Sequence, residues 1–162
     1  MSERKKKKIS KSRKIIVIIG LIFLLIGAAG ITFSALNQKY PLDSDQLGSA
    51  EFVDISGEEY EKLLSEKKTF LVFVDQSDCI TADGLEKIVK ELQNEKNFKV
   101  YRIMLSDARE TSMHDNVKFY PSFVIVGKGE IKSWLKADAD EDTDRYKDKT
   151  ELENWLNNYI RW

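Results

Sequence analysis

The stretch that decides the fold runs from Thr69 to Val74 and reads Thr-Phe-Leu-Val-Phe-Val. A continuous run of aromatic and β-branched residues is typical of a central strand that is covered on both faces of its sheet. A short polar loop follows, and from Ile80 to Leu92 the apolar residues recur at helical spacing. The sequence therefore predicts a buried strand that leads through a tight loop into a helix beginning beside Cys79.

Strand-like and helix-like segments alternate on both sides of this stretch. The expected strands lie at 51–55, 69–74, 98–105, 122–126 and 130–135, and the last two are joined by a Gly-Lys-Gly hairpin signal at 127–129. The expected helices follow Ser56, cover 80–92 and 107–116, and start again at Thr150. Both Ser56 with Glu59 and Thr150 with Glu153 have capping-box spacing. This order predicts a three-layer α/β fold with a central mixed sheet flanked by helices.

The N-terminal part of the chain differs sharply in composition from the rest. Eight of the 26 basic residues lie in the first 14 positions, whereas the chain from Asn37 onward carries 18 basic and 26 acidic residues. Between them, 15–33 is a run of 19 residues without a charge, close to the length that spans a bilayer. We therefore predict a basic cytoplasmic segment at 1–14, a transmembrane helix at 15–36, a spacer at 37–50 and a folded domain at 51–162.

The charge asymmetry around the apolar run also predicts its orientation. Positive residues are retained in the cytoplasm, so we expect a single-pass signal-anchor in the cell membrane with the C-terminal domain extracytoplasmic. A cleaved signal peptide is the alternative, because the run follows a basic region and ends in small residues. The run is longer than a usual signal-peptide core, which favours the anchor. Topology explains the lysines sufficiently, so no nucleic-acid partner is expected.

Three local patterns occur in order along the chain. The first is the strand 70–74 followed by Asp78-Cys79-Ile80-Thr81-Ala82, the second is Val117-Lys118-Phe119-Tyr120-Pro121-Ser122-Phe123, and the third is the Gly-Lys-Gly hairpin with the terminal helix. Taken together they resemble the thioredoxin superfamily, whose members have a cis proline before a strand in the segment that matches the second pattern. The resemblance covers about 51–162 and implies a thioredoxin-like fold. Within the superfamily the chain most resembles small membrane-anchored members from Gram-positive bacteria, including bacteriocin-accessory proteins.

The resemblance also implies where function resides. A thiol at a helix N-terminus lies beside unpaired backbone N–H groups and the positive end of the helix dipole, which favour the nucleophilic thiolate. Cys79 is therefore the candidate catalytic thiol. A turn with a cis proline would place backbone beside the sulfur, where an extended chain can pair. The expected partner-binding residues are those next to the thiol and in this turn: Asp78, Ile80, Thr81, Ala82, Tyr120 and Pro121.

The sequence also departs from the family pattern in ways that affect the chemistry. Ala82 stands where the family has the second Cys, so no internal thiol could release a partner held on Cys79 in a mixed disulfide. Phe73 replaces a buried carboxylate, and Asp78 precedes the Cys where an aromatic residue is usual. Cys79 could therefore be a one-thiol redox group or a link between two copies. It could instead be a structural residue, or belong to a module that binds without electron transfer.

These departures set the expected function. We expect the main role to be the binding of a partner that is itself an exported or membrane protein. A mixed disulfide between this partner and Cys79 can accompany the binding. A one-thiol oxidoreductase in cell-envelope thiol–disulfide exchange is the alternative, and dithiol oxidoreductase activity is not expected.

Neither a metal nor another cofactor is expected. One Cys and one His exclude an intramolecular disulfide and leave too few ligands for a Cys/His zinc cluster. The side chains of Asp140, Asp142, Asp144 and Glu151 have the spacing of a calcium loop, but Arg145 stands where such a loop needs Gly. We interpret this acidic stretch as a solvated loop.

Overall fold

The computed structural model describes residues 39–162. The basic segment expected at 1–14 and the transmembrane helix expected at 15–36 lie outside the described residues, so both stay predictions. Among residues 39–162, no helix is long and apolar enough to cross a membrane.

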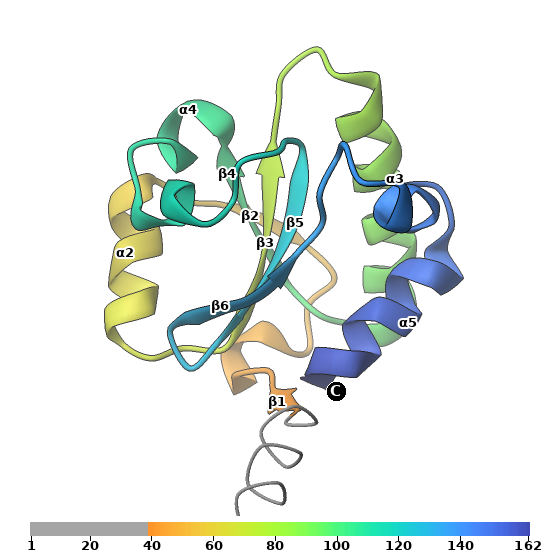
Figure 1. Ribbon diagram of the computed structural model, residues 1–162. Helices are drawn as coiled ribbons and strands as arrows, with labels where there is room; N and C mark the ends of the chain where they lie inside the picture. The colour runs from red at the N-terminus through yellow and green to blue at the C-terminus, as the bar shows by residue number, and fades with distance from the viewer. Residues whose placement is uncertain (1–38) are drawn as a thin grey trace, which may run out of the picture. The chain divides into compact units, whose positions relative to one another are not determined.

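A five-stranded mixed sheet forms the centre of the described unit (Figure 1). Its strand order is β2-β4-β3-β5-β6, in which β2 and β3 run parallel to β4 while β5 runs antiparallel to both β3 and β6. The strands are β2 (Phe52–Asp54), β3 (Phe70–Asp75), β4 (Val100–Met104), β5 (Ser122–Gly127) and β6 (Glu130–Trp134). The predicted mixed sheet and the central place of the 69–74 run are confirmed.

Helices cover both faces of this sheet. Figure 1 shows α2 and α4 on one face and α3 and α5 on the other. Their bounds are α2 (Gly57–Ser65), α3 (Ile80–Lys96), α4 (Leu105–Ala108) and α5 (Lys149–Tyr159), with three 3-10 helices η1 (Ser44–Gln46), η2 (Ser112–Asp115) and η3 (Asp140–Tyr146). The expected three-layer arrangement is therefore present.

Strand β3 supplies side chains to both hydrophobic cores. Leu71 and Phe73 pack in the cluster formed with α3 and α5, whereas Phe70, Val72 and Val74 pack in the cluster on the α2 side. All five side chains have no exposed surface. Alternating residues of a strand point to opposite faces, so a strand between two helix layers needs apolar residues at every position.

The two predicted capping boxes have different outcomes. At α2, the Ser56 hydroxyl accepts the Glu59 N–H at 3.2 Å while the Glu59 carboxylate accepts the Ser56 N–H at 2.8 Å, which confirms the capping box. At α5 the prediction is wrong: Asp148 is the N-cap and accepts the N–H groups of Thr150 and Glu151. Asp is at least as good an N-cap as Thr, and Glu153 instead pairs with Lys96.

The polar helix expected at 107–116 is divided into two short helices. The helix α4 ends at Ala108, and η2 begins after Thr111, whose hydroxyl accepts the Met113 N–H at 3.3 Å. A buried Thr hydroxyl that bonds local backbone competes with a continuing α-helix.

The hairpin predicted between β5 and β6 is confirmed. Lys128 and Gly129 both have positive φ, 54° and 77°, as a two-residue turn of this kind requires.

The segment expected as a spacer at 37–50 belongs in part to the folded unit, which begins at Lys39 rather than at residue 51. Strand β1 (Tyr40–Pro41) pairs in parallel with the C-terminal strand β7 (Ile160–Arg161). Leu42 is only 6% exposed and packs in the α3/α5 core, and Asp43 accepts the Thr69 N–H at 3.2 Å. These contacts are with residues far away in sequence, so no local periodicity indicates them.

Replacing Leu42 tests whether this segment is part of the core. Leu42→Ala should lower the free energy of unfolding by about 2–5 kcal/mol, because it leaves a cavity among buried apolar side chains. Leu47→Ala is the matched control, since the Leu47 side chain is 43% exposed, and it should cost less than about 1 kcal/mol. Urea unfolding of the full chain in neutral detergent measures both. Equal small losses would show that the segment does not support the core.

Candidate functional site

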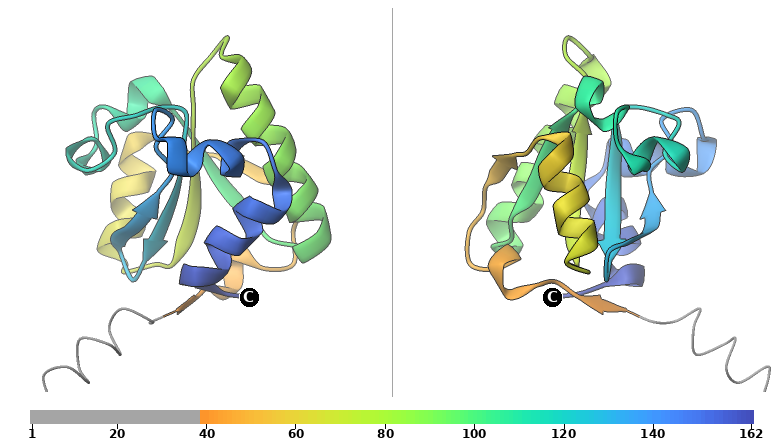
Figure 2. Two further views of the ribbon diagram at one scale, coloured as in Figure 1. Left: turned by 45° about the vertical axis from the view of Figure 1, so that its right-hand side comes forward. Right: turned by 90° about the vertical axis from the view of Figure 1, so that its left-hand side faces the viewer.

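The predicted site residues meet at one edge of the sheet. Strand β3 ends at Asp75 and is followed by the loop to α3, and Pro121 directly precedes β5. In the β3–β5 register Val74 stands opposite Ser122, so the loop and the proline turn leave the sheet side by side. Figures 1 and 2 show both connections at the same end of the sheet. We call this end, with residues 75–83, 104–121 and 135–148, the Cys79 edge.

Cys79 occupies the N-cap position of α3. Its backbone is extended, with φ −111° and ψ 113°, and its side chain makes no capping hydrogen bond. The thiol is free and half-buried, and it packs against the α3/α5 core. Asp78 before it has a φ of 57°, a left-handed conformation that Asp adopts more readily than most residues. The chain thus turns sharply to place the sulfur at the N-terminal end of a 17-residue helix.

The neighbours of Cys79 differ in their exposure. Ile80 is 89% exposed, and Asp78 and Thr81 are also exposed. Ala82 is 1% exposed, because three residues along the helix its side chain turns toward the sheet. This corrects the expectation that Ala82 lines a contact surface, because its side chain packs in the α3/α5 core.

The Tyr120-Pro121 peptide bond is cis, as the resemblance implied. Pro121 itself is buried, and its carbonyl is occupied by a hydrogen bond from Tyr146, so it offers a partner neither side chain nor backbone. The exposed apolar side chain of this turn is that of Phe119, at 43%. Phe119 was missing from the residues expected to bind a partner. Its exposure depends on how the turn leaves the sheet, which its sequence neighbours do not indicate.

Side chains from two 3-10 helices hold the proline turn in place. The buried hydroxyl of Tyr146, at the end of η3, donates to the Pro121 carbonyl at 2.7 Å. The Tyr120 hydroxyl donates to the Val117 carbonyl at 2.5 Å, and His114 Nδ1 lies 3.4 Å from that hydroxyl. Burial raises the pKa of the Tyr146 hydroxyl, which keeps it protonated as a donor. No sequence signal links Tyr146 to this turn.

Asp142 has a structural role in the acidic stretch. It is 3% exposed, its Oδ2 accepts the Lys136 N–H at 2.7 Å, and its Oδ1 pairs with the Arg145 guanidinium. Its carboxylate therefore links η3 to the segment that follows β6. In the described part of the chain, no group of three or more His, Cys, Asp or Glu side chains is placed to hold a metal ion.

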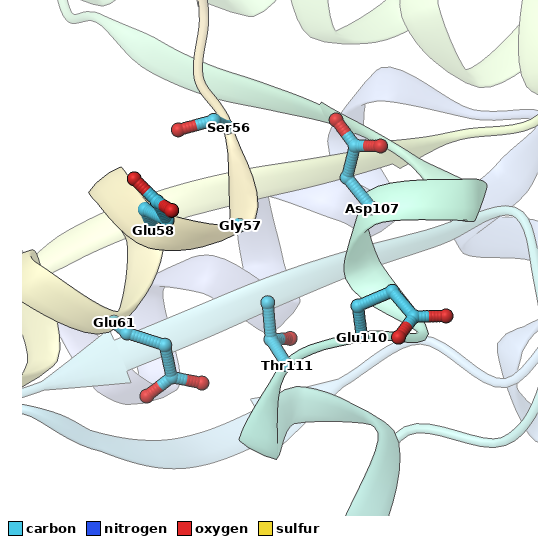
Figure 3. A pocket seen from close by; sticks show the side chains of 7 residues that line it. All are labelled: Ser56, Gly57, Glu58, Glu61, Asp107, Glu110 and Thr111. Atoms are coloured by element: carbon cyan, nitrogen blue, oxygen red, sulfur yellow. The ribbon is translucent and has the colours of Figure 1, made fainter.

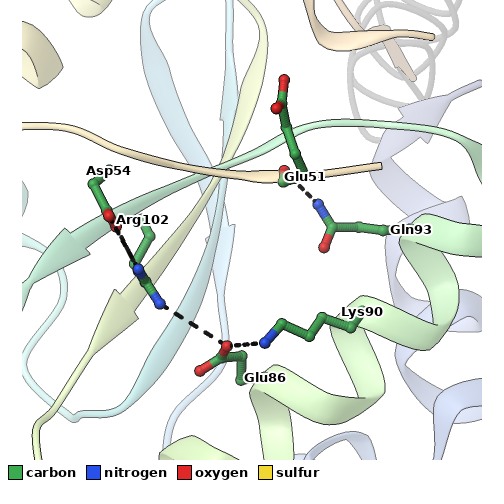
Figure 4. Close-up of polar contacts among 6 residues, drawn as sticks. All are labelled: Glu51, Asp54, Glu86, Lys90, Gln93 and Arg102. Carbon is green, nitrogen blue, oxygen red and sulfur yellow. Dashed lines mark hydrogen bonds and ion pairs between the residues drawn. The ribbon is translucent and has the colours of Figure 1, made fainter. Parts of the chain in front are cut away.

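A polar network joins β2 and β4 to α3 (Figure 4). Arg102 donates to both oxygens of Asp54 at 2.5 and 3.0 Å and lies 3.9 Å from Glu86, which pairs with Lys90. Desolvation raises the pKa of Asp75 here, and the charges of Glu86 and Asp83 add to this while Arg102 opposes it.

Phe73, by contrast, is fully buried in the α3/α5 core. Its ring centroid lies 5.8 Å from that of Phe52. Phe73 is thus an apolar packing group of the core against which Cys79 packs, and it offers no proton acceptor there.

An open pocket of about 610 Å³ lies at the same edge, between the start of α2 and the segment that follows α4 (Figure 3). It is lined by Ser56, Gly57, Glu58, Glu61, Asp107, Glu110 and Thr111. A Cβ at Gly57 would lie 3.0 Å from the methyl carbon of Thr111, so this Gly lets the two segments approach closely. Glu61 accepts the Ser112 N–H at 2.6 Å. No sequence pattern indicated this pocket.

Comparison with known proteins shows the fold. No family model matches the chain, and no curated protein matches it. Among solved structures, a mutant thioredoxin from Halobacterium salinarum is 17% identical, with a TM-score of 0.55 over 71% of this chain and 96% of that one.

Two other thioredoxins are similar in the same way. The oxidised thioredoxin from Plasmodium falciparum is 13% identical, with a TM-score of 0.52 over 68% of this chain and 100% of its own. The reduced thioredoxin pre-protein from Schistosoma mansoni is 17% identical, with a TM-score of 0.51 over 68% and 99%. The described part of this chain therefore has a thioredoxin-like fold, as its sequence predicted.

The shifted carboxyl groups predict opposite pH effects on stability. Asp75 has a folded-state pKa above its ordinary 3.8, so its ionisation costs stability as pH rises from 3.8 through that raised value. Asp75→Asn should therefore become more stable relative to wild type as pH rises above 3.8. Asp54, whose pKa Arg102 lowers, stabilises the fold above 3.8 and loses this contribution in acid.

Asp54→Asn is thus the opposite-sign control, and its deficit relative to wild type should shrink as pH falls. Urea unfolding at a series of pH values gives both differences. A stability difference for Asp75→Asn that does not change with pH would show that burial does not disfavour its charge.

Proposed function

We propose that this chain is a membrane-anchored, extracytoplasmic thioredoxin-like protein that binds partner polypeptides at the Cys79 edge and can hold them in a mixed disulfide. The observation that carries the proposal is the juxtaposition at one sheet edge of a helix-capping thiol and the Tyr120-Pro121 turn. The exposed side chains of Ile80 and Phe119 on the same edge offer apolar contacts. A thiol with apolar contacts beside it can hold a Cys-containing segment.

The covalent step requires only the partner's own disulfide as oxidant. The Cys79 thiolate attacks one sulfur of that disulfide, the S–S bond of the partner breaks, and its other sulfur leaves as a thiolate that takes up a proton. Cys79 and the first partner sulfur are then joined. The chain has a single Cys, so no internal thiol can attack this bond. The bound partner stays until an external thiol releases it.

The lack of a second thiol favours stable partner binding over catalytic turnover of disulfides. A one-thiol oxidoreductase is the second candidate, and it would need a small external thiol as co-reactant to reduce the mixed disulfide. The half-buried position of Cys79 at a helix N-terminus is compatible with both roles. The lifetime of the mixed disulfide distinguishes them.

The anchored, exported location is argued from sequence. Eight basic residues precede the 19-residue uncharged run, and the folded unit after it has an excess of acidic residues. Such an arrangement places the basic end in the cytoplasm. An oxidising compartment outside the cytoplasm is also where partner disulfides persist.

The single Cys makes the topology testable. On intact cells, a membrane-impermeant maleimide should label Cys79, because the domain is outside the membrane, and Cys79→Ser should abolish the labelling. A Cys introduced at Ser10, in the basic segment of the Cys79→Ser chain, should react only after the cells are opened. Labelling of Ser10→Cys on intact cells, with none of Cys79, would reverse the proposed orientation.

Restoring a second thiol should convert holding into release. In Ala82→Cys the introduced Cβ lies one helical turn from that of Cys79, about 5–6 Å away, so its thiol can attack the mixed disulfide. With a disulfide-bridged probe peptide, the covalent adduct on non-reducing gels should fall about tenfold or more relative to wild type. Ala82→Ser, of similar size but without a thiol, should keep the wild-type adduct.

The controls separate the possible outcomes. Cys79→Ser should form no adduct in either background. A wild-type chain that forms no adduct while its thiol is alkylated freely would leave Cys79 without the proposed role. An Ala82→Cys adduct as abundant as the wild-type adduct would show that a thiol at 82 does not reach the bond.

A further inference from the structure

Exposed apolar side chains are concentrated at the Cys79 edge. In the described part of the chain four large hydrophobic residues are exposed, and three of them, Ile80, Met104 and Phe119, belong to this edge. Ile80 starts α3, Met104 ends β4 opposite Asp75, and Phe119 precedes the proline turn. The fourth, Leu47, forms a bridge with Phe98, at the opposite end of β4. Single exposed apolar side chains are common on protein surfaces, but three at one edge of a sheet can together contact a bound segment.

The same edge carries almost all the net negative charge of the folded unit. Residues 39–162 contain 18 basic and 26 acidic residues, an excess of eight negative charges. The three segments 75–83, 104–121 and 135–148 contain twelve acidic and five basic residues, an excess of seven. The rest of the unit is therefore close to neutral. Charge complementarity at this edge therefore favours a positively charged partner.

The carboxylates next to the apolar side chains are mostly uncompensated. In residues 39–162, none of Asp78, Asp83, Asp107 and Glu110 forms an ion pair within 4.0 Å. Asp78 and Asp83 flank Ile80 in sequence, while Asp107 and Glu110 follow Met104 and line the open pocket of about 610 Å³. Clustered charges of one sign raise the local concentration of oppositely charged ligands.

We propose that the polypeptide bound at the Cys79 edge is cationic: a segment with apolar residues that contact Ile80, Met104 and Phe119, flanked by Lys or Arg residues that meet the surrounding carboxylates. This inference deepens the proposed function and rests on it. An acidic segment would bring like charges together at the same surface, which costs free energy. A surface of anionic lipid would be repelled for the same reason.

The test uses non-covalent binding, so it does not depend on thiol chemistry. The full chain with Cys79→Ser, in neutral detergent, is titrated into three fluorescent Cys-free peptides that share their apolar residues and differ only in carrying Lys, Glu or Gln. We expect the Lys peptide to bind about tenfold more tightly than the Glu peptide at about 20 mM salt. The ratio should fall to within about twofold at about 0.5 M salt, where exposed charges are screened.

A matched pair of triple variants locates the effect. Asp78→Asn, Asp83→Asn and Glu110→Gln together should reduce the Lys-to-Glu ratio at low salt to about threefold or less, because three carboxylates of the edge are lost. Glu66→Gln, Glu130→Gln and Glu151→Gln together remove the same charge outside the edge and should leave the ratio unchanged. Asn tolerates the left-handed conformation of position 78, and Asp83 and Glu151 both lie in a first helical turn.

The outcomes decide between the two proposals. A Lys peptide that binds no more tightly than the Glu peptide, or equal effects of the two triple variants, would overturn the cationic-partner inference. Ile80→Ser should weaken binding of all three peptides, and no weakening would remove the apolar contact from the proposal. If the wild-type chain still forms covalent adducts in those cases, the proposed function stands and only the class of partner is wrong.

Discussion

Burial of β3 on both faces is the constraint on which the rest of the fold depends. Five consecutive side chains, Phe70 to Val74, have no exposed surface. Burying each such side chain stabilises the fold by about 1.5–3 kcal/mol, and this requires helices on both sides of the sheet. The same burial excludes this strand from an edge of the sheet, so it lies between β4 and β5.

The candidate site lies where this burial ends. Apolar side chains stop at Val74, and from Asp75 onward the chain is polar until Ile80, so the loop leaves the core at the edge of the sheet. The next strand in the sheet, β5, starts at that edge directly after the proline turn. Loops at the end of a rigid sheet can carry reactive groups without disturbing the core, since strands fix their ends while solvent contacts their tips.

The thiol at this edge has acidic neighbours in the sequence. Asp78 and Asp83 lie on either side of Cys79 in the sequence, so a partner that reaches the thiol also meets these carboxylates. In the proposed complex, a cationic segment would offset the carboxylates as it docks. Because position 82 is Ala and carries no thiol, no group of the chain would attack the mixed disulfide, and the partner would stay bound.

The sequence alone determined the local elements and their order. The doubly buried strand, the Ser56 cap, the two-residue hairpin turn and the position of Cys79 before a helix all follow from residue type and spacing over a few positions, because those features rest on local physics. Resemblance to a known fold, and not local spacing, predicted that Cys79 and the proline turn lie in one site. The structure has that fold.

Only the tertiary structure decided the contacts between segments distant in the chain. These include the packing of Leu42 into the core, the Tyr146 hydroxyl on the Pro121 carbonyl, and the acidic pocket between α2 and α4. It also decided that Phe119 is exposed while Ala82 is buried. Such contacts depend on which segments the folded sheet brings together, and a pattern within one segment carries no information about its distant neighbours.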